Sequence, residues 1–214
     1  MRNFPHKSAE KTVTVQLLIQ HGADVKAQDD THTAPLHLAS SLGIPEIVQL
    51  LIDHGADVIA QDWMRRTPLH LASSLVSSKL ALLSIKDRAD LYGQDDSDRE
   101  PDRGNSHAKP NIVMLLIDHG ADVTAQDEAQ STPLHLASSI GGVETVRLLI
   151  DHGADVTSQD GNRKTPLHLA SSRVSIETVH LLVQRELMFK GRKMCPKRIF
   201  FGKSPMTRLI SCRY

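Results

Sequence analysis

Cysteine is nearly missing from this chain of 214 residues, which has only Cys195 and Cys212. The long part before them therefore has no disulfide framework, as is typical of proteins that fold in a reducing compartment. No apolar run approaches the roughly 20 residues of a membrane-spanning helix, and the start lacks the continuous apolar stretch of a secretory signal. These absences predict an intracellular protein of the cytoplasm or nucleus.

An excess of charge of one sign is also missing, because 25 Lys and Arg residues balance 25 Asp and Glu residues. This balance argues against general attraction to nucleic acid or to a membrane. The charge is unevenly spread, since residues 188–214 carry eight basic residues and no acidic one, leaving 17 basic against 25 acidic before them. We interpret 188–214 as a basic tail that either contacts nucleic acid or anionic membrane or is an extension without a role.

Catalytic signatures are a third absence. The sequence has no glycine-rich phosphate loop, no HExxH zinc motif and no GxSxG serine motif. A recurring Ser-Ser pair could suggest nucleophiles, but a pair found four times cannot define one pocket with its own base and oxyanion donors. We therefore predict no catalytic, cofactor-binding or metal-binding residue, and no enzyme activity.

What the sequence does contain is a repeat. Pro35, Pro68, Pro133 and Pro166 each open the string Pro-Leu-His-Leu-Ala-Ser-Ser, at intervals of 33, 65 and 33 residues. The middle interval is two periods less one residue, with Pro101 standing 33 residues after Pro68. The string His-Gly-Ala-Asp-Val keeps the same phase and begins at His21, His54, His119 and His152. Fixed periods of this length indicate stacked repeats.

Each unit reads as two short helices. Proline suits the first turn of a helix, and Thr67, Thr132 and Thr165 precede their prolines as plausible N-caps. A second helix over 46–54 has a broad apolar stripe, and Gly55 follows where a left-handed residue often ends a helix. Neither helix can bury its stripe alone, so neighbouring units must stack to form a continuous core.

The strings Thr-Pro-Leu-His-Leu-Ala and Gly-Ala-Asp-Val, at a pitch of 33, resemble the ankyrin repeat over roughly residues 10–187. The resemblance implies an all-α solenoid whose units have an inner helix, an outer helix and a projecting finger loop. The expected division is an N-terminal segment with a half repeat at 1–32, then repeats at 33–65, 66–98, 99–130, 131–163 and 164–187, then the tail.

The chain departs from the family pattern in several places. The family usually has glycine three residues before the proline, where this chain has His32, Arg65, Gln130 and Arg163. The 66–98 repeat has Ser84 and Arg88 in place of a buried leucine and a glycine, so its outer helix is degenerate. The 99–130 repeat has polar residues at 102–105, and we expect its inner helix to be disordered, with a loop or weak hinge over 94–111. The array then has a degenerate region in its middle.

Twelve histidines raise the question of a metal site. The resemblance implies that His37, His70, His135 and His168 tie neighbouring loops together by hydrogen bonds. The histidine that opens each His-Gly-Ala-Asp-Val string stands in the last turn of an outer helix, where a polar or cationic side chain is favourable. Repetition once per unit is what a structural role predicts.

The resemblance implies that another protein is bound by the concave face and the finger loops. Among the finger residues, Trp63, Met64, Arg65 and Arg66 are types enriched at interface centres, although Trp63 could instead fold back onto its own finger. The alternative function is regulation through nucleic acid or membrane contact by the tail. The expected contact residues are Thr31, Thr33, Ser41, Leu42, Trp63, Met64, Arg65, Arg66, Ser74, Leu75, Glu128, Ser131, Ser139, Ile140, Asn162, Lys164 and Arg173.

Overall fold

The computed structural model describes residues 7–74, 108–140, 142–172 and 175–189. Within these ranges every regular element is a helix, which confirms the all-α prediction. The helices are α1 (Lys7–Gln20), α2 (Pro35–Leu42), α3 (Pro45–Asp53), α4 (Pro68–Ser73), α7 (Ala108–Asp118), α8 (Pro133–Ile140), α9 (Val143–Asp151), α10 (Pro166–Ser172) and α11 (Ile176–Phe189).

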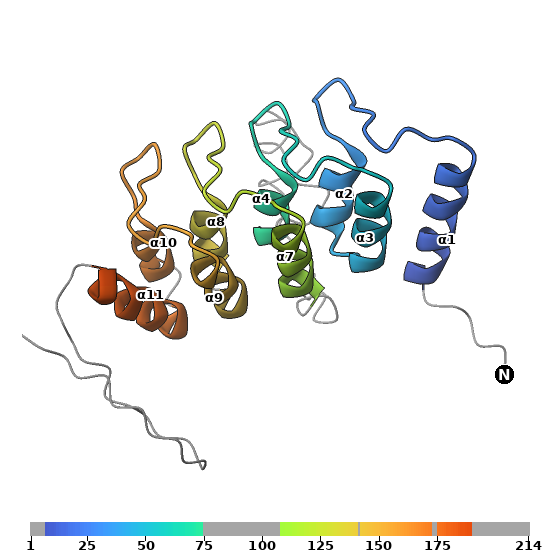
Figure 1. Ribbon diagram of the computed structural model, residues 1–214. Helices are drawn as coiled ribbons and strands as arrows, with labels where there is room; N and C mark the ends of the chain where they lie inside the picture. The colour runs from blue at the N-terminus through green and yellow to red at the C-terminus, as the bar shows by residue number, and fades with distance from the viewer. Residues whose placement is uncertain (1–6, 75–107, 141, 173–174, 190–214) are drawn as a thin grey trace, which may run out of the picture.

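The helices form two rows. An inner row runs α2, α4, α8 and α10, and an outer row runs α1, α3, α7, α9 and α11, with each helix packed on the next in its row. Long loops project from the inner row to one side of the molecule (Figure 1). A side chain on one layer is therefore covered by the layers before and after it, as expected for a solenoid.

The layer made by α2 and α3 shows why these residues fold this way. Each helix begins with proline, whose missing N–H costs nothing in the first turn. The ring Nδ1 of His54 lies 2.8 Å from the carbonyl oxygen of Leu50 and satisfies an acceptor at the end of α3. Gly55 then adopts a left-handed φ of 84° and ends the helix. Leu36 and Leu51 point between the helices and are buried.

The middle of the array differs from the expected division. Helix α4 packs on α7 and also on α8, while α7 packs between α3 and α9. The units expected at 66–98 and 99–130 thus contribute one helix each to a single layer of the array. The boundary at 98/99, the degenerate outer helix and the polar stretch at 102–105 lie outside the described residues.

One end of the expected loop over 94–111 is helical. Helix α7 already begins at Ala108, so the loop prediction is wrong for its last four residues. Pro110 does not prevent this, because it stands in the first turn, where backbone N–H groups have no partner within the helix.

The half repeat expected within 1–32 contains helix α1, which begins at Lys7. In the described chain it packs on α3 and no inner helix lies beside it. Its Leu18 is 56% exposed, whereas Leu51, at the same position of α3, is 3% exposed. A complete neighbouring layer accounts for this difference.

At the other end, α11 continues to Phe189, two residues beyond the expected end of the repeats at 187. Its Arg185 lies where the earlier outer helices have histidine, and its Nη2 is 2.5 Å from Oδ1 of Asp151 on α9. This ion pair holds the longer last helix to the array. The tail from residue 190 onward lies outside the described residues.

Candidate partner-binding surface

Each finger loop is a five-residue turn organised by its first residue, an aspartate. In the finger 62–66, Oδ1 of Asp62 accepts the backbone N–H groups of Met64 and Arg66 at 3.0 and 2.8 Å. The backbone N–H of Asp62 in turn donates to the carbonyl oxygen of Arg66 at 3.0 Å. The turn is therefore closed from both sides, in the way that aspartate stabilises turns. Equivalent aspartates open the other fingers at Asp29, Asp127 and Asp160.

The fingers are also joined to one another. The N–H of Trp63 donates to the carbonyl oxygen of Thr31 at 3.0 Å, that of Glu128 to Met64 at 2.8 Å, and that of Gly161 to Ala129 at 2.9 Å. These bonds repeat at equivalent positions, so the fingers 29–33, 62–66, 127–131 and 160–164 form one continuous row. The bond between Glu128 and Met64 places the second and third fingers in neighbouring layers.

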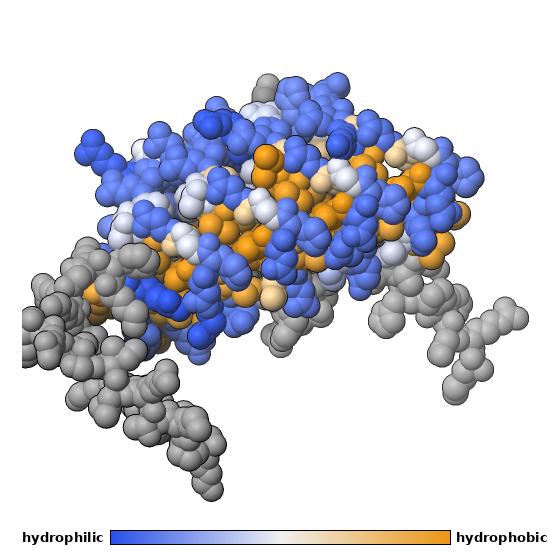
Figure 2. Space-filling view, viewed as in Figure 1, coloured by the Kyte–Doolittle hydropathy of each residue, from blue (hydrophilic) through white to orange (hydrophobic). Residues whose placement is uncertain are grey.

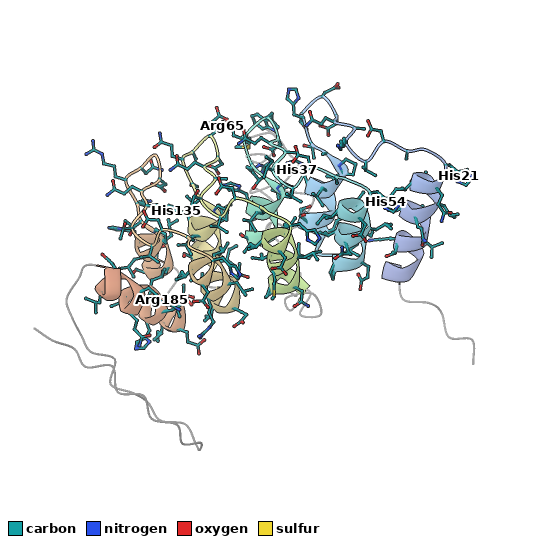
Figure 3. All side chains as sticks on the ribbon, viewed as in Figure 1. His21, His37, His54, Arg65, His135 and Arg185 are labelled. Carbon is teal, nitrogen blue, oxygen red and sulfur yellow. The ribbon has the colours of Figure 1, made fainter. Side chains whose placement is uncertain are left out.

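The fourth residue of every finger has a left-handed backbone. The φ angles of His32, Arg65, Gln130 and Arg163 lie between 56° and 60°. These are the positions where the sequence lacks the expected glycine, and a side chain there costs more than glycine would. All four side chains are exposed, and Arg65 lies at the outer end of its finger, away from the helices (Figure 3).

Trp63 lies in the second finger and is 40% exposed. The structure thus combines both interpretations of this residue, because part of the indole is covered by its own chain and a substantial part is open. Met64 beside it is half-buried. A half-exposed tryptophan on a backbone fixed by hydrogen bonds is a suitable anchor for a partner.

The two arginines of this finger differ. Arg65 is exposed, whereas Arg66 donates from Nε to Oδ2 of Asp62 at 2.8 Å, with Nη2 at 2.6 Å from the same oxygen. The side chain of Arg66 is nearly buried in this pair. Its guanidinium therefore stabilises the finger, and of the two only Arg65 presents its charge openly.

The serines expected to contact a partner from the inner helices are not accessible. Ser41 and Ser74 are buried, and their hydroxyls donate to the carbonyl oxygens of Leu38 and Leu71. The contact prediction is therefore wrong for both. Leu42 next to Ser41 is exposed, and Leu75 lies outside the described residues.

The other expected contacts are placed unevenly. In the first finger Thr31 is exposed and Thr33 is buried, so Thr33 is a wrong contact prediction. Glu128, Asn162 and Lys164 are exposed on the third and fourth fingers. Half-buried positions are occupied by Ser131, Ser139 and Ile140, and Arg173 lies outside the described residues.

The motif histidines hold one layer to the next. Nε2 of His37, His70 and His135 lies 3.1 Å from the carbonyl oxygens of Arg66, Ser131 and Lys164, each in the following finger. Their Nδ1 atoms face a backbone N–H at 3.1 to 3.2 Å and must accept it. This assigns the neutral tautomer with its hydrogen on Nε2.

Burial lowers the pKa of all three histidines below its ordinary value, against the opposing effect of the carbonyl that each ring donates to. In the first finger the hydroxyl of Thr31, followed by the N–H of Thr33, lowers the pKa of the Asp29 carboxyl. Each shift favours the form that the hydrogen bonds need, namely a neutral imidazole and a charged carboxylate.

Other features of the surface bear on metal binding, membrane insertion and small-molecule binding. Among the described residues, no group of three His, Cys, Asp or Glu side chains converges as a metal site would require. None of the helices in the ranges that the structure covers is long and apolar enough to cross a membrane. A groove of about 480 Å³ lies between α7 and α9, where Gly142 replaces the buried Ile44 of the α2–α3 layer. Its lining by described residues includes Met114 and Leu148.

Apolar and polar side chains gather on different parts of the molecule. An apolar band crosses the face formed by the outer helices, while the finger side is mostly hydrophilic (Figure 2). Contacts at the fingers would therefore be made by polar groups around a few apolar anchors.

Sequence reasoning missed two features of the fingers. The aspartate that opens each finger stands six residues before the motif proline in all four cases, and this fixed spacing was the available signal. The exposed residues His32, Gln130 and Arg163 were noted only as departures from glycine, although that position is where a finger displays its side chain.

Comparison with known proteins agrees with this architecture. A family model described as "Ankyrin repeats (3 copies)" matches residues 6–95 and 105–192. None of the curated proteins compared with the chain matches it. Ankyrin repeats are generally protein–protein interaction modules and are typically non-catalytic. Because the matches cover most of the chain and the described helices stack in two rows joined by fingers, the chain belongs to the ankyrin-repeat family.

Proposed function

We propose that this chain is an adaptor or recognition subunit that holds a partner protein with its finger row and the exposed edge of its inner helices, without catalysing a reaction. The observation that carries the proposal is Trp63. Its backbone is fixed by a hydrogen bond to Thr31 and by the Asp62 turn, yet 40% of the side chain is exposed. A large, partly exposed aromatic ring on a fixed backbone is the kind of side chain that anchors a partner.

A location-resolved crosslinking experiment tests the proposal. A photoreactive amino acid is placed at Gln130 on the finger row or, as a matched control, at Arg147, which is exposed on the outer helix α9. We expect crosslinks to a defined partner from position 130 and not from position 147. Crosslinks from position 147 alone would contradict the proposal.

Once a partner is in hand, Trp63→Ala measures the anchor. We expect partner affinity to fall by at least ~2 kcal/mol with little change in melting temperature, as for an interface hot spot. If Trp63→Ala lowers the melting temperature and spares affinity, the indole is a packing element and the partner binds elsewhere.

The second candidate function is contact with nucleic acid or anionic membrane through the tail, and its support is the eight basic residues of 188–214. Removing residues 190–214 leaves α11 intact and separates the two candidates. Binding through the fingers survives this deletion, whereas binding through the tail is lost.

A further inference from the structure

The fingertips alternate in charge along the row. In the second finger, Arg65 is exposed beside the neutral Trp63. The third finger exposes Glu128 beside the neutral Gln130, and the fourth exposes Arg163 and Lys164. No described residue forms an ion pair with Arg65, Glu128 or Arg163. The three fingertips therefore present free charges in the order positive, negative, positive.

The spacing between Arg65 and Arg163, which hold the same position in their fingers, follows from the finger geometry, and Glu128 lies on the finger between them. Each finger is a turn closed across its own two sides, and one hydrogen bond joins it to the next finger. Each finger has two chain segments side by side, and neighbouring segments lie about 4.8 Å apart. The fingers therefore repeat every ~10 Å along the row. Neighbouring helices in each row pack roughly 8–10 Å apart, so the spacing between fingers must be about the same. A polypeptide in extended conformation rises about 3.3 Å per residue, so every third residue meets a new finger.

The structure alone supplies the register. In the sequence, 65 residues separate Pro68 from Pro133, which would place an additional finger between those of Arg65 and Glu128. The bond from the Glu128 N–H to the Met64 carbonyl shows that these two fingers are direct neighbours. Arg65 and Arg163 are therefore two layers apart, about 20 Å, or six residues of an extended chain.

The outer-helix side of the described chain repels an acidic partner. The outer helices and the loops after them expose acidic side chains in nearly every layer, and their few basic residues include Arg185, which is paired with Asp151. The exposed acidic residues are Asp24, Glu46, Asp53, Asp57, Asp118, Asp122, Glu144, Asp151, Asp155 and Glu177. Carboxylates of a partner are thus directed to the second and fourth fingers.

We infer that the finger row, the partner-binding surface of the proposed function, takes an extended segment with an acidic, a basic and an acidic residue at every third position. The acidic residues meet Arg65 and Arg163, the basic residue meets Glu128, and an apolar residue beside the first acidic one covers Trp63. This inference rests on the proposed function and names its partner by chemistry.

The left-handed backbone shared by all four fingers fixes where each finger displays its fourth side chain. Arg65 and Arg163 keep φ angles of 58° and 60°, which glycine would adopt with less strain. Side chains retained in such conformations are often functional. An arginine at this position displays its guanidinium at the outer end of the finger, as Arg65 does in Figure 3.

The test uses the full chain labelled with ¹⁵N and three synthetic peptides, each with one Leu before its first Glu. The first has Glu, Lys and Glu at every third residue of a Gly/Ser background. Its isomer has Glu, Glu and Lys at the same positions, which places Glu against Glu128. The third has Glu, Lys and Glu at every seventh residue of an alanine-rich helix. Amide chemical shifts report both the site and the affinity, including weak affinity.

We expect the first peptide to shift amides of the second to fourth fingers and to bind about fivefold more tightly than its isomer at low salt. The preference should fade as salt is raised, because the pairs are exposed. Equal binding of the two isomers, stronger binding of the helical peptide, or no shifts at the fingers with any peptide would each overturn the inference.

Single substitutions separate the effect of an exposed charge on peptide binding from its effect on folding. Arg65→Gln and Arg163→Gln should each weaken the first peptide about two- to fivefold, while Arg147→Gln on α9 changes nothing. Arg65→Gly should lose the same affinity without lowering the melting temperature, since glycine suits this φ. Glu128→Lys should abolish the preference between the isomers. Unchanged peptide affinity in the Arg65 and Arg163 variants contradicts the inference.

The proposed function can survive the failure of this inference. If crosslinking at position 130 identifies a partner whose affinity depends on Trp63 but not on Arg65 and Arg163, the chain is a binding module with a different ligand pattern. If neither position 130 nor Trp63 matters for any partner, the proposed function itself fails.

Discussion

Residues 132–139 and 165–172 have the same sequence, Thr-Pro-Leu-His-Leu-Ala-Ser-Ser, and yet their side chains lie in different environments. His135 in the first segment is fully buried and its Nε2 bonds to the carbonyl of Lys164. His168 in the second is exposed, and its Nδ1 accepts the backbone N–H of Thr165 and lies 2.8 Å from the Thr165 hydroxyl. The two helices differ in their neighbours, because α8 lies between α4 and α10, whereas α10 has an inner helix on one side only among the described residues.

This difference shows that the motif histidine joins two layers only where the next layer covers it. Helix formation needs the local string alone, since both copies begin with proline and keep the bond from the threonine N–H to histidine Nδ1 at 3.2 Å. Burial of the histidine, and its hydrogen bond to the next layer, need a following finger. The loss of stability when a residue is substituted should therefore depend more on the layer in which the residue lies than on its type.

The largest expected difference between the two segments is at their first leucine. Leu134 is fully buried and Leu167 is half-buried. Leu134→Ala should lower the free energy of unfolding by about 3–5 kcal/mol, because it leaves a cavity between layers, and Leu167→Ala by only about 1–2 kcal/mol. Denaturant unfolding of both variants measures this. Equal losses would mean that the last layer is covered as completely as the internal ones.

Acid should destabilise the internal layers through their three buried histidines. Burial lowers the pKa of His37, His70 and His135 in the folded chain, while the unfolded rings titrate near the ordinary value of about 6.5. Below that pH the unfolded state binds more protons, so stability is present above it and is lost as the pH falls toward the lowered values. The slope has an upper limit of about 4 kcal/mol per pH unit for three protons.

Chemical denaturation between pH 8 and pH 5 measures this loss. His135→Gln removes one of the three titrating groups and should reduce the slope by up to one third. A free energy of unfolding that stays constant over this range would contradict the neutral tautomer assigned to the three rings.

The sequence was sufficient for the features that repeat in phase. The prolines, the His-Gly strings and the period of 33 predicted the helices, because each signal acts within one unit. The positions of left-handed backbone were also readable, since they stand three residues before each motif proline. Ser41 and Ser74 were misjudged because their exposure depends on helix packing: each hydroxyl turns back to a carbonyl three residues earlier.

The order of the layers could not be read from the sequence. A local pattern cannot specify which outer helix packs on α4, because the outer helices share the same apolar stripe. Contacts between segments far apart in the chain, such as that of His70 with Ser131, decide this. The pairing of Arg66 with Asp62 was hidden for a related reason, since the turn that brings them together is set by the hydrogen bonds of the Asp62 carboxylate to the finger backbone.

The next contrast separates the two motif histidines. His135→Ala should lower the free energy of unfolding by ~1–3 kcal/mol, because the carbonyl of Lys164 and the N–H of Thr132 lose their buried partner. His168→Ala should cost less than ~1 kcal/mol, since the exposed groups around it can bind water. Partner binding should persist in folded His135→Ala molecules. Tight stoichiometric zinc binding that His135→Ala removes would show that this ring is a ligand instead of a tie.

The smallest expected effect has the opposite sign. The Oγ of Ser138 is buried and has no hydrogen-bond partner among the described residues, whereas Ser171 at the same position of α10 is exposed and donates to Leu167 at 2.8 Å. Both substitutions to alanine gain similar helix propensity, so their difference isolates the unpaired hydroxyl. Ser138→Ala should raise the free energy of unfolding by about 1 kcal/mol more than Ser171→Ala.

Ser40 and Ser73 share the unpaired state of Ser138, so a triple alanine variant should add the three gains, because the serines lie in separate layers. A loss of stability in Ser138→Ala would show that an internal water or a rotated hydroxyl satisfies this oxygen, and the internal layers would then be no less well hydrogen-bonded than the terminal one.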